Sequence, residues 1–567
     1  MNSKQRIYDL WKALYPQQPT DLLDNFMSDL KPFDGSLTQD PLWYKDIVVY
    51  SLYVDLFAKD FHGLSARLDY LQELGVSCLW LLPILDSPMR DAGFDIRHYD
   101  RIRHDLLGLD TDFTQEQQET VFGSFLQEAH QRGIRVIFDI AINHCSEEHP
   151  WFVEARKSED NPYRDYFIWT KDPELYKDAR IIFKGMEDSN WEKEGDSWFF
   201  HRFFNFQPDL NYRNPAVLLE MTRNLLYWQQ LGVDGFRADA IPYLWKEDGT
   251  DSENLPQTHW IVKFFRAVLD YVKPGTLLLA EACQKPAAVV EYLGDGDECH
   301  AAYHFPVMPM FYKAIAMQSS QPIRHILSPQ VTPEIPANSQ WFTFLRCHDE
   351  LSLELVYVSE EDRRYIHEQY CHEPEWDFRM GEGISARLAN LFQFDERRIG
   401  LAYSMIFSLP ATPVIYYGDE FGKENDTQYY QQMKTFVGKD DTRFLVRGPV
   451  NWELRMKQLA DSNTFQAKVW SRLHQMLQQR KQYAVFGRGA IRFVDAYSKE
   501  EKNDHILAYE RVLENERMLI VQNLSDSKQL IQINAVEKMA TDILTAQPYS
   551  LRSLPMEPYA YHWFKIT

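Results

Sequence analysis

The sequence lacks several features that would place a protein in a broad class at once. It has only six cysteines in 567 residues, and none forms a C-x-x-C pair, which argues against a disulfide framework or a cysteine-based zinc site. No run of about 18 apolar residues occurs, so we expect no transmembrane helix. The N-terminus has no apolar stretch typical of a signal peptide, and a cytoplasmic location is therefore expected.

Positive charge is also scarce. Lys and Arg number 60 against 83 Asp and Glu, which gives a formal net charge of −23. Nucleic acids and anionic membranes would repel such a chain, so neither is expected as a partner. We expect instead a neutral small molecule, and a homo-oligomer stays possible. The hydrophobic fraction of 45% and the length predict a globular protein of two or three domains.

From about residue 45 the sequence alternates between apolar strands and helical segments. Eight strand signals, most of them separated by helices, predict a parallel (β/α)8 TIM barrel ringed by helices. The expected strands are 46–54, 76–82, 134–142, 233–239, 276–281, 301–305, 341–345 and 413–417.

Three segments fall outside this alternation. Residues 1–40 are predicted to form a helical N-terminal extension. Residues 145–212 are rich in aromatic and charged residues, and we predict that they form a domain inserted after the third strand. Residues 484–567 contain alternating strands between turn signals and predict a C-terminal antiparallel β-sandwich. The barrel would then comprise residues 41–144 and 213–483.

Polar residues stand at the carboxyl ends of four expected strands. Arg237 and Asp239 lie two residues apart in the fourth, so they share one face, and the arginine favours the charged form of the aspartate. A lone pair of this kind is more often a structural ion pair. However, the third strand ends in Asn143-His144, the fifth in Glu281, and the seventh leads into His348-Asp349. All would lie on the rim that carries the active site in such barrels.

Three acids on one rim suit the cleavage of a glycosidic bond, which uses one carboxylate as nucleophile and one carboxylic acid as proton donor. Asp239 is the expected nucleophile. Glu281 follows an apolar run, where desolvation raises the pKa of a carboxyl group, and is the expected acid. Asp349 would bind sugar hydroxyls, and His144 and His348 would be neutral hydrogen-bonding partners. Each histidine alone could equally be a core residue with a satisfied ring.

Together these segments resemble glycoside hydrolase family 13, the α-amylase family. The matching motifs are D-I-A-I-N-H (139–144), Q-P-D-L-N (207–211), G-F-R-A-D-A (235–240), L-L-A-E-A (278–282) and R-C-H-D (346–349). The resemblance implies a catalytic (β/α)8 barrel, a domain B after strand three and a β-sandwich domain C. It also implies that Asp239 is the nucleophile, Glu281 the acid/base and Asp349 the transition-state stabiliser, and that no cofactor is required.

Within this family the chain is most similar to the trehalose synthases, which belong to the oligo-1,6-glucosidase branch. The similar stretches lie at 179–183, 201–204 and 254–306. The motif D-A-G-F-D (91–95) resembles one whose first Asp, with an Arg matched here by Arg447, caps the non-reducing end of the sugar. A paired Asp91 and Arg447 would make a closed pocket for short substrates, with Phe94 stacking on a sugar ring.

The chain also departs from the family pattern. The Asp/Asn-rich calcium loop expected after the first strand is missing, and two asparagines usual near the sugar are Cys283 and Cys347. Asn143 and Asp209 match a second calcium site of related enzymes. Hydrogen bonds that tie domain B to the barrel would explain these two residues equally well.

Three functions follow from these features. The first is a retaining glucosyltransferase or isomerase of the trehalose synthase type, acting on short α-glucosides through a glucosyl-enzyme intermediate. The second is an α-glucosidase or α-amylase that transfers the glucosyl group to water, since the departures alter the acceptor side. The third is a non-catalytic scaffold on the same fold, which the presence of all three carboxylates argues against.

Overall fold

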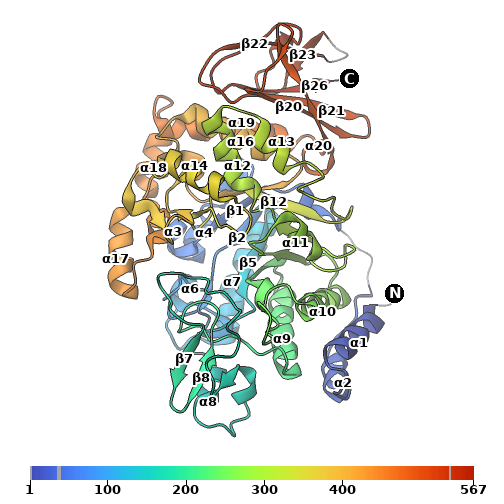
Figure 1. The fold of residues 1–567 in the computed structure, drawn as a ribbon, viewed down its shortest axis with the longest axis vertical. Coiled ribbons are helices and arrows are strands. Elements are labelled where there is room, and N and C mark those ends of the chain that lie inside the picture. The colour runs from blue at the N-terminus through green and yellow to red at the C-terminus, as the bar shows by residue number, and fades with distance from the viewer. Residues whose placement is uncertain (1–2, 35–39, 535–537, 567) are drawn as a thin grey trace.

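Eight parallel strands close into a barrel at the centre of the computed structural model, which describes residues 3–34, 40–534 and 538–566 (Figure 1). Their order around the barrel is β1-β16-β12-β11-β10-β9-β5-β2, so all eight predicted strands are confirmed. The strands are β1 (Val49–Leu52), β2 (Cys78–Leu81), β5 (Arg135–Ala141), β9 (Gly235–Asp239), β10 (Leu277–Ala280), β11 (Ala301–Tyr303), β12 (Gln340–Phe344) and β16 (Thr412–Tyr416).

Helices cover the outside of the barrel and bury their apolar residues against it, and two of them begin at clear side-chain caps. Helix α7 (Gln115–Gln131) begins with a capping box, in which the side chains of Thr114 and Gln117 each accept the other's backbone N–H. Helix α9 (Pro215–Leu231) begins after Asn214, whose side chain accepts the N–H of Ala216. Other covering helices are α10 (Pro256–Val272), α12 (Val307–Met317), α16 (Glu396–Ser408) and α19 (Phe465–Arg480).

The register between strands fixes where the polar side chains emerge. Asp139 on β5 pairs with Arg237 on β9, and Ala141 pairs with Asp239. Gly235 opens β9 where the backbone of β10 is close: a Cβ there would lie 2.5 Å from the carbonyl oxygen of Leu277. The missing side chain lets β9 seat fully against β10, and this pairing carries Asp239 to the rim.

Between β5 and α9 the chain forms α8 (Pro150–Ala155) and a small sheet of order β6-β8-β7. Its strands are β6 (Trp169–Thr170), β7 (Trp191–Glu194) and β8 (Ser197–Phe200). The segment protrudes at the bottom of Figure 1. We call the chain between β5 and α9 the inserted segment; the predicted limits of domain B, residues 145–212, stay a prediction.

The C-terminal strands form two antiparallel sheets at the opposite end of the molecule (Figure 1). Six strands are ordered β17-β20-β21-β26-β23-β24, and four are ordered β19-β18-β22-β25. They enclose their own apolar cluster, which includes Ile506, Leu519, Val521 and Phe564. The bounds are β17 (Ala490–Val494), β18 (Ala496–Ser498), β19 (Glu501–Lys502), β20 (Ile506–Leu513), β21 (Glu516–Asn523), β22 (Gln529–Ile533), β23 (Met539–Asp542), β24 (Pro548–Ser550), β25 (Leu554–Met556) and β26 (Tyr561–Ile566).

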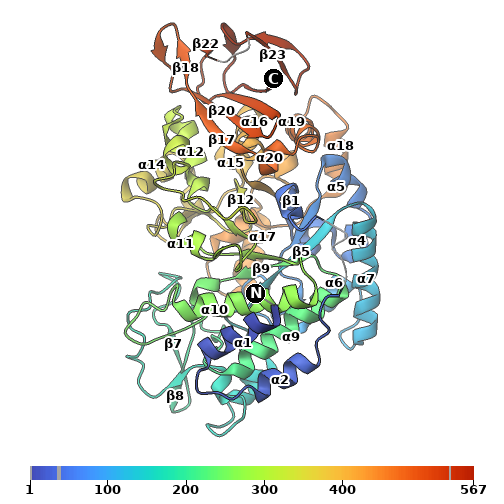
Figure 2. The same cartoon turned by 90° about the vertical axis from the view of Figure 1, so that its right-hand side faces the viewer.

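Helices α1 (Ser3–Leu14) and α2 (Asp21–Ser28) pack outside α10 and α9 (Figure 2). Trp11 on α1 is fully buried beside Phe264 on α10, and the hydroxyl of Tyr15 donates to the carbonyl of Tyr212 at 2.8 Å. The N-terminal segment is therefore part of the folded unit.

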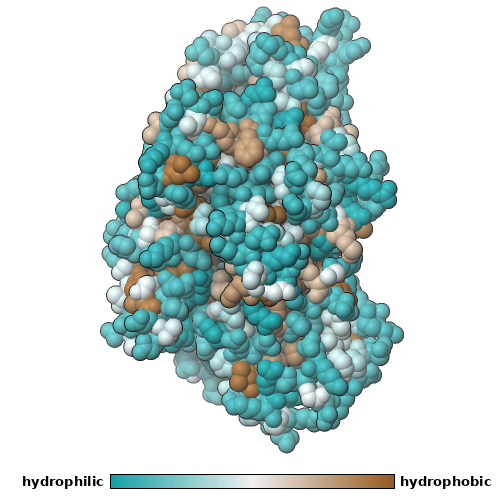
Figure 3. Space-filling view, turned by 90° about the vertical axis from the view of Figure 1, so that its left-hand side faces the viewer, coloured by the Kyte–Doolittle hydropathy of each residue, from teal (hydrophilic) through white to brown (hydrophobic). Residues whose placement is uncertain are grey.

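The surface is largely polar on the face shown in Figure 3, where hydrophobic side chains occur only in scattered groups. Among the described residues no helix combines the length and apolarity that crossing a bilayer requires.

Candidate active site

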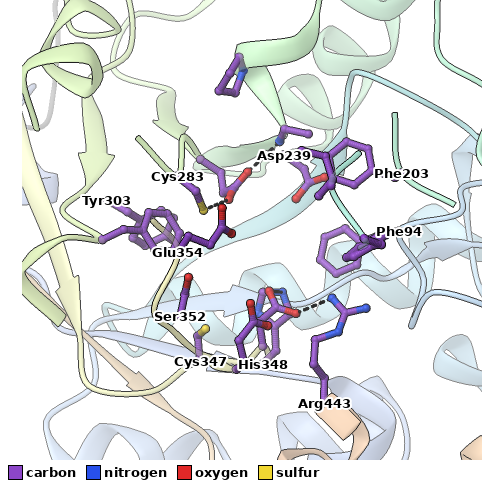
Figure 4. Close-up of a pocket in the computed structure, with 18 of the residues that line it drawn as sticks. Phe94, Phe203, Asp239, Cys283, Tyr303, Cys347, His348, Ser352, Glu354 and Arg443 are labelled. Atoms are coloured by element: carbon purple, nitrogen blue, oxygen red, sulfur yellow. Dashed lines mark hydrogen bonds and ion pairs between the residues drawn. The ribbon is translucent and has the colours of Figure 1, made fainter. Parts of the chain in front are cut away.

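One cavity opens at the carboxyl ends of the barrel strands and brings the predicted acids together (Figure 4). Asp239 ends β9, Glu281 directly follows β10, and Asp349 lies in the loop after β12; all three line this cavity. Its volume of about 120 Å³ is small for a ligand pocket. Five further predicted residues also line it: Asp91, Phe94, His144, Arg237 and His348.

Arg237 is the electrostatic centre of the site. Its Nη1 donates to Asp139 Oδ1 at 2.6 Å and to Asp239 Oδ1 at 2.5 Å, and its Nη2 lies 3.9 Å from Glu281 Oε1. The guanidinium is 4% exposed, so these interactions are little screened by water. Asp139 also accepts a hydrogen bond from Trp80 at 2.7 Å. One fixed cation thus holds both Asp239 and Glu281 at the same cavity.

Glu281 has the environment of a proton donor. Burial raises the pKa of its carboxyl group, and the nearby charge of Asp239 raises it further. Arg237 lowers this pKa, but burial outweighs it. The N–H of Ala240 donates to Oε2 at 3.0 Å, and Cys283 Sγ lies 3.1 Å from Oε1. Ala240, the residue after Asp239, adopts a strained left-handed backbone conformation with φ of 55°.

Asp349 is held as a carboxylate by three neighbours. Its Oδ1 accepts from Arg443 at 3.1 Å and from Arg447 at 3.2 Å, and its Oδ2 lies 2.9 Å from His348 Nε2. Burial alone would raise its pKa, but these neighbours outweigh burial and hold the pKa well below the usual value. Asp349 is therefore suited to accept hydrogen bonds from hydroxyl groups.

The two predicted histidines are buried and neutral, because burial lowers the pKa of each ring. Within the described chain His144 Nε2 and His348 Nδ1 have no hydrogen-bond partner. Each ring therefore keeps one buried nitrogen without a partner beside the cavity. Phe94 stacks on His348 with ring centres 5.4 Å apart, so it shapes the cavity wall.

The predicted pairing of Asp91 with Arg447 is wrong. Asp91 Oδ1 instead contacts Arg443 Nη2 at 3.4 Å, and its Oδ2 accepts from Gln207 at 2.9 Å. Arg447 instead donates from Nε to the carbonyl of His348 at 2.9 Å and so supports the loop that carries Asp349.

Arg443 is placed at the cavity by the short helix η6 (Thr442–Val446) and by its pairing with Asp441. Burial raises the pKa of Asp91 to about 7.

Asn143 and Asp209 do not fit the calcium site that the resemblance implied. Lys246 Nζ lies 2.7 Å from Asn143 Oδ1 and 2.8 Å from Asp209 Oδ2. This ammonium group, 2% exposed, occupies the position between the oxygens that a metal ion would need. Asp209 also accepts the N–H of Arg202 at 2.9 Å. The alternative expectation, that hydrogen bonds tie the inserted segment to the barrel, describes these residues. Asp209 belongs to the inserted segment, Asn143 follows β5, and Lys246 contacts both.

Several cavity residues were not predicted. Arg180 reaches in from the inserted segment, donating to Glu253 at 2.8 Å and to Glu354 at 3.3 Å. Glu350 is another buried carboxyl group that lines the cavity, and burial raises its pKa to about 7. Arg180 lies in the stretch 179–183, which resembles trehalose synthases. This resemblance was the one feature of the sequence that could have identified Arg180 as a cavity residue. Phe183, Phe203 and Arg379 also line the cavity.

Comparison with known proteins agrees with the fold. Residues 43–372 match the family model described as alpha amylase, catalytic domain, and residues 499–563 match the one described as maltogenic amylase, C-terminal domain. The chain belongs to the α-amylase family.

Among its relatives is the trehalose synthase/amylase of Mycobacterium tuberculosis, 45% identical over 409 residues, which are 70% of this chain and 65% of that protein. This chain thus spans about two thirds of that relative's length. The trehalose synthase of Pimelobacter sp. is 36% identical over 580 residues, covering 94% of this chain and 97% of that one. A solved structure of an α-amylase from H. orenii shares the fold, with a TM-score of 0.68 at 21% identity, covering 92% of this chain and all of the other.

Proposed function

We propose that the chain is a retaining α-glucoside-active enzyme that converts maltose into trehalose through a glucosyl-enzyme intermediate. The observation that carries the proposal is the cavity in which one guanidinium holds Asp239 and Glu281 while two others hold Asp349. Relatives named trehalose synthase, one of them similar over almost its full length, support the choice of substrate.

The chemistry follows from the charges of the three acids. Asp239 attacks the anomeric carbon as Glu281 passes its proton to the glycosidic oxygen, and a covalent glucosyl ester with Asp239 results. Asp349 accepts hydrogen bonds from sugar hydroxyls, and these strengthen as the ring approaches the transition state. Glu281, now a carboxylate, then removes a proton from the hydroxyl of the acceptor, which attacks the ester.

The acceptor decides between isomerisation and hydrolysis. Arg180 from the inserted segment contacts Glu354 in the chain between β12 and α16, and Phe183 and Phe203 line the same cavity. A closed cavity keeps the released glucose beside the ester and excludes water. Reattack by the anomeric hydroxyl of that glucose gives trehalose.

Hydrolysis of short α-gluco-oligosaccharides is the second candidate. The relative named trehalose synthase/amylase favours it, as does the replacement of two expected amide side chains by Cys283 and Cys347. Thiols bind sugar hydroxyls weakly, so the acceptor glucose would be held less firmly.

A product profile tests these alternatives. The protein is incubated with maltose, trehalose, sucrose, isomaltose and maltotriose, and the products are followed by NMR. Trehalose from maltose, with retained α-configuration, is the expected result. Free glucose alone would favour the hydrolase, and no turnover of any sugar would leave only the non-catalytic alternative. We further propose a cytoplasmic enzyme that needs no cofactor and binds neither nucleic acid nor membrane.

A further inference from the structure

Cys283 stands directly against the carboxyl group assigned as the proton donor. Its thiol points into the cavity beside that carboxyl group (Figure 4), with Sγ 3.1 Å from Glu281 Oε1. The other carboxyl oxygen, Oε2, accepts the N–H of Ala240 at 3.0 Å. The two oxygens of one carboxyl group therefore have different partners.

This difference determines where a proton can reside. A backbone N–H can only donate, so Oε2 must remain an acceptor in both protonation states. A thiol is a weak donor and a weak acceptor, and it can reverse its role by rotating the S–H bond. A donated hydrogen bond makes an oxygen harder to protonate, and Arg237 Nη2, 3.9 Å from Oε1, is too far away to donate one. The N–H of Ala240 on Oε2 therefore favours the hydrogen of protonated Glu281 on Oε1, beside Cys283.

We propose that Cys283 is a positioning residue that keeps the transferable proton of Glu281 on Oε1 and holds the carboxyl plane toward the glycosidic oxygen. The proposal rests on the proposed function. In the first step the proton leaves Oε1 for the glycosidic oxygen, which keeps the electron pair of the breaking bond. An oxygen of Asp239 forms the new bond to the anomeric carbon. The resulting Oε1 carboxylate then accepts the S–H hydrogen bond, so the thiol supports both states.

A weak donor suits a carboxyl group that must gain and lose a proton in each cycle. The thiol stabilises the carboxylate less than an amide or a guanidinium would, and the pKa of Glu281 stays raised by burial. Other charged or titratable groups around this pair come from several elements. They are Arg237 and Asp239 on β9, and Glu350, Glu354 and Tyr357 from the chain between β12 and α16.

The test compares two substrates that differ in their need for a proton. Maltose requires protonation of its leaving oxygen, whereas fluoride leaves α-glucosyl fluoride with little assistance. We expect Cys283→Ala to lower kcat/KM for maltose about tenfold and for α-glucosyl fluoride less than about twofold. The basic limb of the pH profile should move to higher pH, since the carboxylate loses a hydrogen bond. Cys283→Ser, whose hydroxyl can also donate to Oε1, should restore kcat/KM for maltose and move the basic limb back to lower pH.

Cys371→Ala, a thiol removed outside the cavity, is the control. If Cys283→Ala does not fold, Cys283→Val fills the volume of the thiol without a hydrogen bond and takes its place. Equal losses on both substrates, or an unmoved pH profile, would overturn the role of Cys283. A wild-type protein that turns over neither substrate would instead refute the proposed function.

Discussion

Asp239 shows how a single side chain depends on its neighbours, because its role follows from the guanidinium that it shares with Asp139 and Glu281. Asp239→Asn keeps the shape but replaces the nucleophile with an amide. We expect turnover of maltose to fall by about 10⁴-fold or more, while sugar binding and Tm stay close to wild type. Initial rates, ligand titration and calorimetry check this. Activity within tenfold of wild type would contradict the assignment.

Under the proposed function, Asp91 and Arg443 close the cavity at the non-reducing end of the sugar. Asp91→Ala removes one side of this pair and opens space for a further glucose unit. The ratio of kcat/KM for maltotriose to that for maltose should rise about tenfold, as expected when a charge-assisted contact to the terminal glucose is lost. Asp69→Ala, at a carboxylate that is 83% exposed, is the matched control. An unchanged ratio would show that this pair does not set substrate length.

His304 gives a residue-scale prediction about stability. Its Nδ1 accepts the N–H of Val307 at 3.1 Å, its Nε2 lies 2.8 Å from the hydroxyl of Thr332, and burial lowers its pKa to about 4. An unfolded histidine titrates near pH 6.5, so between pH 6.5 and pH 4 the unfolded chain binds a proton that the folded chain does not. Stability therefore falls as pH falls through this window.

His304→Gln removes that titration. The variant should be less stable than wild type at pH 7, and the difference should shrink by about 2 kcal/mol between pH 7 and pH 5. Urea unfolding at several pH values measures it. Parallel stability curves for the two proteins would mean that the folded histidine titrates normally.

At the scale of elements, charge pairs join the inserted segment to the chain between β12 and α16 and to the chain between β9 and α10. Arg180 contacts Glu253 and Glu354, and Lys184 lies 3.3 Å from Glu382. Arg180→Ala should loosen this closure and admit water. The share of free glucose among the products from maltose should rise several-fold, since water competes with the retained glucose.

Lys184→Ala is the control for this prediction, because its side chain is 55% exposed and its ion pair is worth little. NMR of the product mixture gives the ratio of glucose to trehalose. An unaltered ratio in the Arg180 variant would show that water is excluded by other means.

The C-terminal strands are attached to the barrel through the end of α16. Arg511 on β20 donates to the carbonyls of Ser408, which ends α16, and Gly489, the latter at 2.7 Å. Arg511→Met would leave both buried carbonyls without their donor, and we expect a loss of about 2 kcal/mol in the free energy of unfolding. Arg492→Met, in the same sheet at a side chain that is 71% exposed, should cost less than about 1 kcal/mol. Equal urea midpoints for the two variants would contradict this.

For the whole molecule, the barrel was predictable because its strands are short apolar runs that end in unusual polar residues. Asp239, Glu281 and Asp349 could be grouped from the sequence alone, since parallel strands deliver their carboxyl ends to one rim. The C-terminal sheets followed from alternation between turn signals. These features depend on the local spacing of apolar and polar residues, which a single sequence is enough to show.

The errors have a different origin. Arg443 and Arg447 are four residues apart, in and just after the short helix η6. The sequence does not specify the path of this segment, so only the structure distinguishes which guanidinium faces Asp91. Lys246 lies in Trp245-Lys246-Glu247, which reads as a surface turn, and its burial depends on where the inserted segment returns to the barrel. Arg180 likewise acquires its partners only through contacts between segments far apart in the chain.

Lys246 has one more consequence for how the molecule is assembled. A junction held by a dissociable ion weakens as that ion is diluted or chelated, with a free energy that follows the logarithm of its concentration. Here the positive charge is covalently attached to the chain, so its effective concentration never changes. We therefore expect the junction at Lys246 between the inserted segment and the barrel not to depend on calcium.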